Sequence, residues 1–240
     1  MVLALHLYRR LMRRGRVFWL VLLASVPGLI IAVAGIDADD LDDAIVGIML
    51  SVGFTYAIAA LILTVSTLRD ERDAGTLPYI YMRPMSRLSI AISSILAGVM
   101  AAATIAVGGW LVSVLAGLAH GADMSVLLPG AAMFLAAGFG YAAVFVPVGY
   151  LFSRSVLVGL GYLILVELAL SGLVSGLAQL SIWRIAGSIY VDLLGEKGAN
   201  IPEELLTVAP GVGGGFAKLT VVLVLGTFVL TWALRRRDAL

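Results

Sequence analysis

The 240-residue sequence contains no cysteine, and only 13% of its residues are charged. The lack of cysteine excludes disulfides, iron–sulfur clusters and thiolate metal sites built from this sequence. His6 has no second histidine or carboxylate beside it, so no metal site is expected there. The hydrophobic share is 61%, with 27 glycines. A soluble domain of this size could not bury so much apolar surface in a single core, so we expect an integral membrane protein.

Six stretches are apolar enough and long enough to cross a hydrocarbon core about 30 Å thick, which takes about 20 helical residues. None alternates with the period of two that marks a barrel strand, so each is expected to be a helix. The predicted fold class is an all-α integral membrane protein with six transmembrane helices, in which residues 1–240 form a single transmembrane domain. The predicted spans are 17–36, 44–68, 88–119, 128–152, 156–178 and 215–234.

Arginine and lysine predict the orientation, because cytoplasmic segments carry an excess of basic residues. With the N-terminus inside, 13 of the 16 basic residues fall in cytoplasmic segments. Both termini are therefore predicted to be cytoplasmic, in the cell membrane. The first stretch could alternatively be a secretory signal cleaved near Ala32-Val33-Ala34, but its apolar part is long for a signal.

Two segments outside the spans are predicted to be amphipathic. Residues 1–16 place Leu3, Leu7 and Leu11 at helical spacing beside several arginines, which favours a helix on the inner membrane surface. The alternative is a topology signal with no further role. The outer connection 179–214 is the longest, and its first half predicts an amphipathic helix in or dipping into the outer leaflet, with Trp183 and Tyr190 at headgroup depth. Its predicted polar face consists of Ser181, Arg184, Ser188 and Asp192.

A charged loop, residues 69–87 (RDERDAGTLPYIYMRPMSR), separates the second and third predicted spans on the cytoplasmic side. A short helix fits inside it, with Thr76 as N-cap, Pro78 in the first turn and Pro84 at its end. Residues 79–82 give this helix an apolar surface too short to cross a membrane. Such a surface among arginines is suited to docking a partner protein.

The sequence shows no route to nucleotide binding or hydrolysis. Residues 211–220 (GVGGGFAKLT) are glycine-rich, but Ala217 and Leu219 stand where a phosphate-binding loop needs glycine and a hydroxyl residue. No H-E-x-x-H or G-x-S-x-G motif occurs. We therefore predict that this chain is not an enzyme and that energy must be supplied by another protein.

Glu167 is the only ionisable side chain at the middle of a predicted span. An isolated carboxylate at that depth is costly and marks either a functional site or a polar contact. Proton coupling or contact with a cationic or hydroxylated substrate is one interpretation. The other is an interhelical hydrogen bond to Ser, Thr or Tyr, which is favoured because no second ionisable group lies at equal depth.

The six spans and the E-R-D-A-G-T-L sequence of the loop resemble the type-2 ABC transporter permease family. In that family the loop between the second and third spans reads E-R-E/D-x-G-T-L and then x-P-x-S-R, and it forms the coupling helix that docks on an ATPase subunit. This chain matches at Glu71 to Leu77 and again at Pro84, Ser86 and Arg87, and departs at Pro78. The resemblance implies these ATPase-coupling residues: Glu71, Arg72, Gly75, Thr76, Leu77, Ile80, Tyr81 and Arg83.

The same resemblance implies two permease chains and two copies of a separate ABC ATPase subunit, which would bind ATP and Mg. No cofactor is expected in this chain, and no nucleic acid among its partners; membrane lipids surround it. If the second and fifth spans of two chains enclose a cavity, the substrate path would include Thr55, Tyr56, Thr64, Glu167 and Ser171. That lining fits a neutral or cationic amphipathic substrate moved outward. The alternatives are an ion- or proton-coupled secondary transporter and a non-transporting scaffold subunit.

Overall fold

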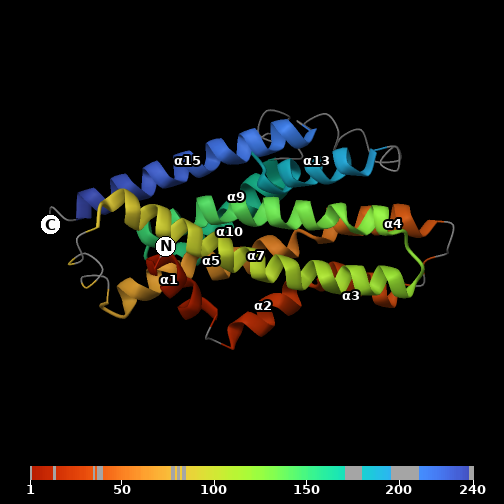
Figure 1. The fold of residues 1–240 in the computed structure, drawn as a ribbon, viewed down its shortest axis with the longest axis horizontal. Helices are drawn as coiled ribbons and strands as arrows, with labels where there is room; N and C mark the ends of the chain where they lie inside the picture. Colours follow the sequence, from red (N-terminus) through yellow and green to blue (C-terminus); the bar gives the residue numbers. More distant parts are fainter. Residues whose placement is uncertain are drawn as a thin grey trace.

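The computed structural model describes residues 2–12, 15–34, 36, 40–76, 79, 82, 85–170, 180–195 and 211–237. Within these residues the chain is helical throughout, without strands, and most of its helices run along one common axis (Figure 1). In this described part of the chain, four helical stretches are long and apolar enough to cross a membrane, and a bent pair would make a fifth. These stretches are α4 (Leu41–Val52) with α5 (Thr55–Asp73), α7 (Arg87–Ala119), α8 (Met124–Leu127) with α9 (Pro129–Leu151), and α15 (Gly211–Arg237).

The first predicted span is broken into two helices. α2 (Arg16–Ala24) and α3 (Val26–Val33) meet at an angle of 54° around Ser25. Both helices pack closely on α7. A Cβ at Gly109 would lie 2.5 Å from the Ala24 carbonyl oxygen, and one at Gly28 would lie 2.5 Å from the Ser113 nitrogen. Glycine at these two positions lets the bent pair follow the surface of α7.

The fifth predicted span begins as α10 (Ser155–Tyr162) and continues as a π-helix, η2 (Leu163–Leu170). Residues 171–179 lie outside the described residues, so the remainder of the predicted span 156–178 stays a prediction. π-Helical turns are rare and often occur at functional sites. Here the π-helix carries Glu167.

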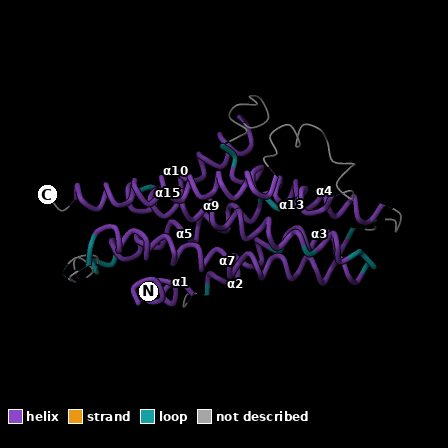
Figure 2. The backbone as a smooth tube through the Cα atoms, turned by 45° about the horizontal axis from the view of Figure 1, so that its top comes forward, coloured by secondary structure: helices purple, strands orange, loops and turns teal. Residues whose placement is uncertain are grey.

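α5 lies at the centre of the bundle (Figure 2). It packs against α9, α7 and α2, and 12 of its 19 residues are buried. α15 lies at the edge, and large apolar side chains along it are exposed, among them Val221, Val224 and Phe228. In an apolar solvent such as the bilayer, an exposed apolar helix face of this kind is stable.

α1 (Val2–Met12) lies across the direction of the long helices and is seen nearly end-on in Figure 2. Leu3, Leu7 and Leu11 are buried, as their helical spacing predicted. α1 packs on α7 and α5, so this leucine face is covered by protein, whereas a helix lying only on lipid would turn it toward the membrane. The basic face, with Arg9, remains exposed.

One end of the bundle collects most of the described arginines, and we call it the basic end. It comprises the start of α2, the end of α5, the starts of α7 and α10, and the end of α15 (Figure 1). Its arginines include Arg16, Arg69, Arg72, Arg87 and Arg235. Aspartates Asp40, Asp42 and Asp123 lie at the opposite end, where Asp42 Oδ1 accepts a hydrogen bond of 3.2 Å from the Asp123 amide.

α13 (Ile182–Leu194) lies within the bundle rather than along its surface. Nine of its 13 residues are buried, and it packs on α9 and α15. The Trp183 indole Nε1 donates a 2.7 Å hydrogen bond to the Leu50 carbonyl, nine residues into the span that starts at Leu41. At 1.5 Å per residue this is about 14 Å from the start of the span. The headgroup depth of Trp183 stays a prediction. Tyr190 is also buried, and it lies toward the end of the bundle opposite the basic end, where its hydroxyl donates to the Val126 carbonyl.

Candidate functional site: the coupling end of α5 and the Glu167 cradle

The end of α5 has the geometry of a Schellman motif. Ala74 is the C-cap and Gly75 follows at φ +66°, in the left-handed region that favours glycine. The Thr76 amide donates to the Glu71 carbonyl (3.0 Å) and the Gly75 amide to the Arg72 carbonyl (3.0 Å). The glycine of E-R-D-A-G-T-L therefore stops α5 and turns the chain into the loop.

Glu71 is turned into the protein and is 2% exposed. Its Oε1 lies 2.5 Å from Arg10 Nη1 of α1, and its Oε2 accepts a 2.5 Å hydrogen bond from the Thr76 hydroxyl. Arg10 also reaches the Thr76 hydroxyl at 3.5 Å. The first and sixth positions of the motif thus bind each other and fix the N-terminal helix to the start of the loop.

Three further arginines connect the end of α5 with neighbouring helices. Arg16 at the start of α2 donates to Ser66 (3.0 Å) and to Asp70 (3.1 Å) on α5. Arg72 donates to the Tyr150 carbonyl in the last turn of α9 at 3.1 Å, and Arg69 to the Ser155 hydroxyl at the start of α10 at 3.5 Å. The last turns of α5 are therefore tied to α1, α2, α9 and α10, and a displacement of this end would act on all four.

The centre of the predicted coupling helix is only partly within the described residues. Tyr79 and Met82 are 67% and 72% exposed. The Tyr79 amide donates to the Thr76 carbonyl at 3.1 Å, as expected where a helical turn begins. The predicted coupling residues Leu77, Ile80, Tyr81 and Arg83 lie outside the described residues, and their role stays a prediction.

The return from the loop into α7 is capped by Ser86. Its side chain accepts a 3.2 Å hydrogen bond from the Ser89 amide, and its own backbone is extended. In the sequence, Ser86 stood out only as part of the family pattern. A serine directly before a long apolar run is itself an N-cap signal and would have predicted where α7 begins.

Glu167 sits in a cradle of five hydrogen-bond donors and is 7% exposed. Its Oε1 accepts from the Tyr141 hydroxyl (3.3 Å) and the Tyr162 hydroxyl (3.4 Å). The remaining donors belong to the start of α13. The Ile182 amide donates to Oε1 (3.0 Å), the Trp183 amide to Oε2 (3.4 Å), and the Ser181 hydroxyl also to Oε2.

This cradle is a helix cap supplied from another helix. The first amides of a helix have no partner within the helix, and the helix dipole favours negative charge there. Ser181 is the N-cap of α13 and accepts from the Arg184 amide at 3.1 Å. Glu167 satisfies the first two amides, those of Ile182 and Trp183, and fixes α13 to the π-helix. A hydrogen bond was the favoured prediction for Glu167, and the described contacts are of that kind, with two tyrosines, a serine and two backbone amides.

The other predicted substrate-path residues lie in different surroundings. Tyr56 and Thr64 are completely buried within one chain, and their hydroxyls donate to the Ala102 carbonyl (3.1 Å) and the Ala60 carbonyl (2.6 Å). Thr55 is half-buried, and Ser171 lies outside the described residues. The structure thus does not bring Tyr56 and Thr64 to a surface that a second chain could face. Their assignment to the substrate path stays a prediction.

Metal binding has no support among the residues that the structure describes. In that part of the chain, no three His, Cys, Asp or Glu side chains lie close enough together to hold an ion. At the basic end, Glu71 is paired with Arg10 and Asp70 with Arg16.

The apolar helices and the basic end define a multi-pass membrane protein of the cell membrane. Residues 12–171 match the profile of the family described as ABC-2 family transporter protein. The chain belongs to this family, as the loop sequence predicted. It is therefore a membrane component of an ABC transporter, a family whose members are generally not catalytic themselves and work with an ABC ATPase subunit. The comparison with curated proteins gave no match.

Proposed function

We propose that the chain is the permease subunit of an ABC exporter and that its loop 69–87 is the coupling site for a separate ATPase subunit. The observation that carries this proposal is the set of side-chain contacts at the end of α5. Arg10, Arg16, Arg69 and Arg72 connect this end with four other helices. A partner that moves the loop would therefore move the centre of the bundle.

The orientation follows from the basic end. Because an excess of Arg faces the cytoplasm, the end that holds Arg16, Arg72 and Arg235 is the cytoplasmic one. Both termini and the loop 69–87 then lie on the side where ATP is available. Exposed Tyr79 and Met82 would offer apolar contacts to the ATPase.

The proposed substrate is lipophilic or amphipathic, neutral or cationic, and is moved outward by a complex of two permease and two ATPase chains. The fifth predicted span supports a path along its surface, because Leu157 and Leu165 are 62% and 58% exposed. No fixed positive charge accompanies them on the described part of this span beyond its first turn. A multiply anionic compound would lose its hydration there without compensation. Stimulation of the complex's ATPase activity by such a compound, and by no amphipathic one, would contradict this choice.

The coupling site is tested by co-purification of the permease with its ABC ATPase subunit. Ile80→Asp, Tyr81→Asp and Met82→Asp each place a charge in the proposed apolar contact. We expect the amount of bound ATPase to fall by about tenfold or more, since burying an unpaired charge costs more than the 1.4 kcal/mol that corresponds to a factor of ten.

Met124→Asp is the matched control. Met124 begins α8 at the opposite end of the bundle and is 42% exposed, so the same substitution there should leave ATPase binding unchanged. Full ATPase binding and transport in all three loop variants would refute the coupling site.

A further inference from the structure

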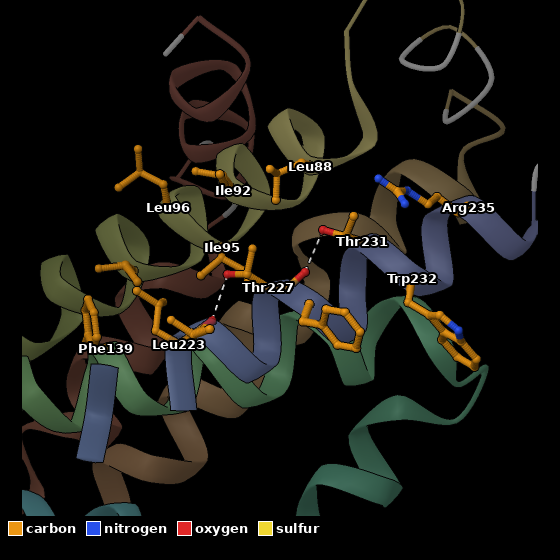
Figure 3. A pocket seen from close by; sticks show the side chains of 13 residues that line it. Leu88, Ile92, Ile95, Leu96, Phe139, Leu223, Thr227, Thr231, Trp232 and Arg235 are labelled. Atoms are coloured by element: carbon orange, nitrogen blue, oxygen red, sulfur yellow. Dashed lines mark hydrogen bonds between the residues drawn. The ribbon is translucent and has the colours of Figure 1, made fainter. Parts of the chain in front are cut away.

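An apolar groove runs between α7 and α15 at the basic end, with a volume of about 810 Å³ (Figure 3). One wall is a stripe of α7 at four-residue spacing, Leu88, Ile92 and Leu96. The other is a stripe of α15 at the same spacing, from Leu223 to Arg235. Phe139 of α9 lies at one end of the groove and Arg235 at the other.

The surface of the groove is apolar even where its residues carry hydroxyls. Thr227 donates to the Leu223 carbonyl (2.8 Å) and Thr231 to the Thr227 carbonyl (2.7 Å), so both hydroxyls are satisfied within α15. Among the residues that the structure describes, no acidic side chain lines the groove, and Arg235 is the only charged one that does. Arg236 does not line the groove, and its guanidinium lies 4.3 Å from the centre of the ring of Trp232, a lining residue.

The groove is as long as one leaflet. From Leu88 to Val99 the α7 wall extends over 11 residues, about 17 Å at 1.5 Å per residue, while half of the hydrocarbon core is about 15 Å thick. A transmembrane helix of a second chain would need a groove that is wider and that extends over the full thickness of the hydrocarbon core. An acyl chain fits the length, and a volume within about 300–1,000 Å³ is typical of small-ligand sites.

We propose that this groove binds one anionic phospholipid from the leaflet at the basic end, with its acyl chains between α7 and α15 and its phosphate at Arg235. A guanidinium binds phosphate oxygens with charge-assisted hydrogen bonds, and basic side chains beside the membrane select anionic lipids. This site is independent of the proposed transport function, because it involves neither the loop 69–87 nor Glu167.

The test uses the full-length protein reconstituted in vesicles of equal phosphatidylglycerol and phosphatidylethanolamine, extracted in a mild detergent and analysed by native mass spectrometry. Wild type should retain phosphatidylglycerol in preference. Arg235→Gln should lower that preference by about fivefold. Arg236→Gln removes the same charge one residue away, on a side chain that does not line the groove, and should change the preference by less than about twofold.

A second pair of variants tests the groove itself. Thr227→Trp fills it and should remove about one retained lipid per chain. Thr220→Trp is the matched control, because Thr220 is exposed on the same helix, bonds the Phe216 carbonyl in the same way and does not line the groove. If Thr227→Trp fails to fold, Ile92→Trp fills the groove from the other wall, at a position that is 50% exposed.

Three results would overturn the proposal. If wild type retains the two lipids equally, the groove does not select for lipid charge. If Arg235→Gln and Arg236→Gln show the same lipid preference, Arg235 does not bind the phosphate. A groove-filling variant that keeps its lipid count but loses a dimer would identify the groove as a contact between two chains.

Discussion

Glu71 and Glu167 are both buried glutamates, 2% and 7% exposed, but they are stabilised by different means. Glu71 at the basic end is paired with the cation of Arg10. Glu167, in the middle of the bundle, has hydroxyls and the amides at the start of α13 around it. An ion pair near the membrane border can exchange one partner for water, whereas a cradle inside the bundle cannot.

The difference fits the two regions. The end of α5 is a junction of five helices that the proposed ATPase contact would displace, and charged contacts there can reform with water or lipid headgroups nearby. The start of α13 is surrounded by apolar side chains, including Phe134, whose ring centre lies 6.0 Å from that of Trp183. We expect the Glu167 cradle to hold α13 on the π-helix in every state of the protein, and the Glu71 cluster to be the part that changes.

The largest effect is expected from Glu167→Ala. This change leaves three hydroxyls and two amides near position 167 without their acceptor, and such a buried network costs about 3 kcal/mol or more to break. The measurement is thermal unfolding of the purified chain in detergent micelles. Glu167→Gln keeps one acceptor oxygen and should lose about half as much.

The same pair of variants separates a structural from a substrate-binding Glu167. If Glu167 is structural, Glu167→Gln should lower the stability of the chain and leave unaltered which substrates stimulate the ATPase. If instead Glu167→Gln unfolds like wild type and changes that preference, the carboxylate contacts substrate and the cradle is secondary.

A smaller and asymmetric effect is expected at the Glu71 ion pair. Arg10→Ala leaves the Glu71 carboxylate, with a side chain only 3% exposed, without its cation, and should cost about 2–3 kcal/mol of unfolding free energy. Glu71→Gln leaves Arg10, 29% exposed, within reach of water and should cost about 1 kcal/mol. If Arg10→Ala and Glu71→Gln lower the unfolding free energy equally, the burial of Glu71 does not decide how much the ion pair contributes to stability.

Ser181→Ala should have a more modest effect, about 1 kcal/mol, because it removes the N-cap of α13 and one donor to Glu167. Ser188→Ala is the control on the same helix. Ser188 is buried too, but its hydroxyl bonds the Ile185 carbonyl, and its loss should cost less than about 0.5 kcal/mol. Ser181→Thr should restore the cap. If Ser188→Ala lowers the unfolding free energy more than Ser181→Ala does, the role of Ser181 as the N-cap of α13 is wrong.

The smallest effect is expected from Asp73→Asn. Asp73 pairs with Arg69 and Arg72, but its side chain is 54% exposed, and pairs of this kind contribute about 0.5 kcal/mol or less. Unfolding in low and high salt measures it directly. A loss larger than that of Glu71→Gln would mean that the exposed carboxylate, and not the buried one, holds the end of α5 together.

Much of the bundle could be predicted from the sequence. The third predicted span, 88–119, agrees with α7 (Arg87–Ala119) to within one residue, and the spans 128–152 and 215–234 lie on α9 and α15. Apolar length is a local property, so it is readable without contacts. The bend between α2 and α3 was missed although its signal is local: Pro27, in the first turn of α3, has no amide proton to continue the hydrogen bonds of α2.

The candidate sites were predicted less completely. The loop motif pointed to Glu71 and Thr76, but as surface residues for a partner, and their contacts with each other and with Arg10 were not foreseen. Arg10 and Glu71 are 61 positions apart, and no local pattern pairs them. For Glu167 the expected kind of contact was right, whereas its partners at the start of α13 were not identified.

The sequence by itself determined that the protein is a multi-pass helical membrane protein of the ABC-2 family, because the share of apolar residues, the position of arginines and the E-R-D-A-G-T-L loop are properties of the chain alone. The tertiary structure decided what each buried carboxylate does. Whether a glutamate is held by a cation, by helix amides or by water depends on which distant segments fold against it, and α13 and α1 come to Glu167 and Glu71 only through the packing of the whole bundle.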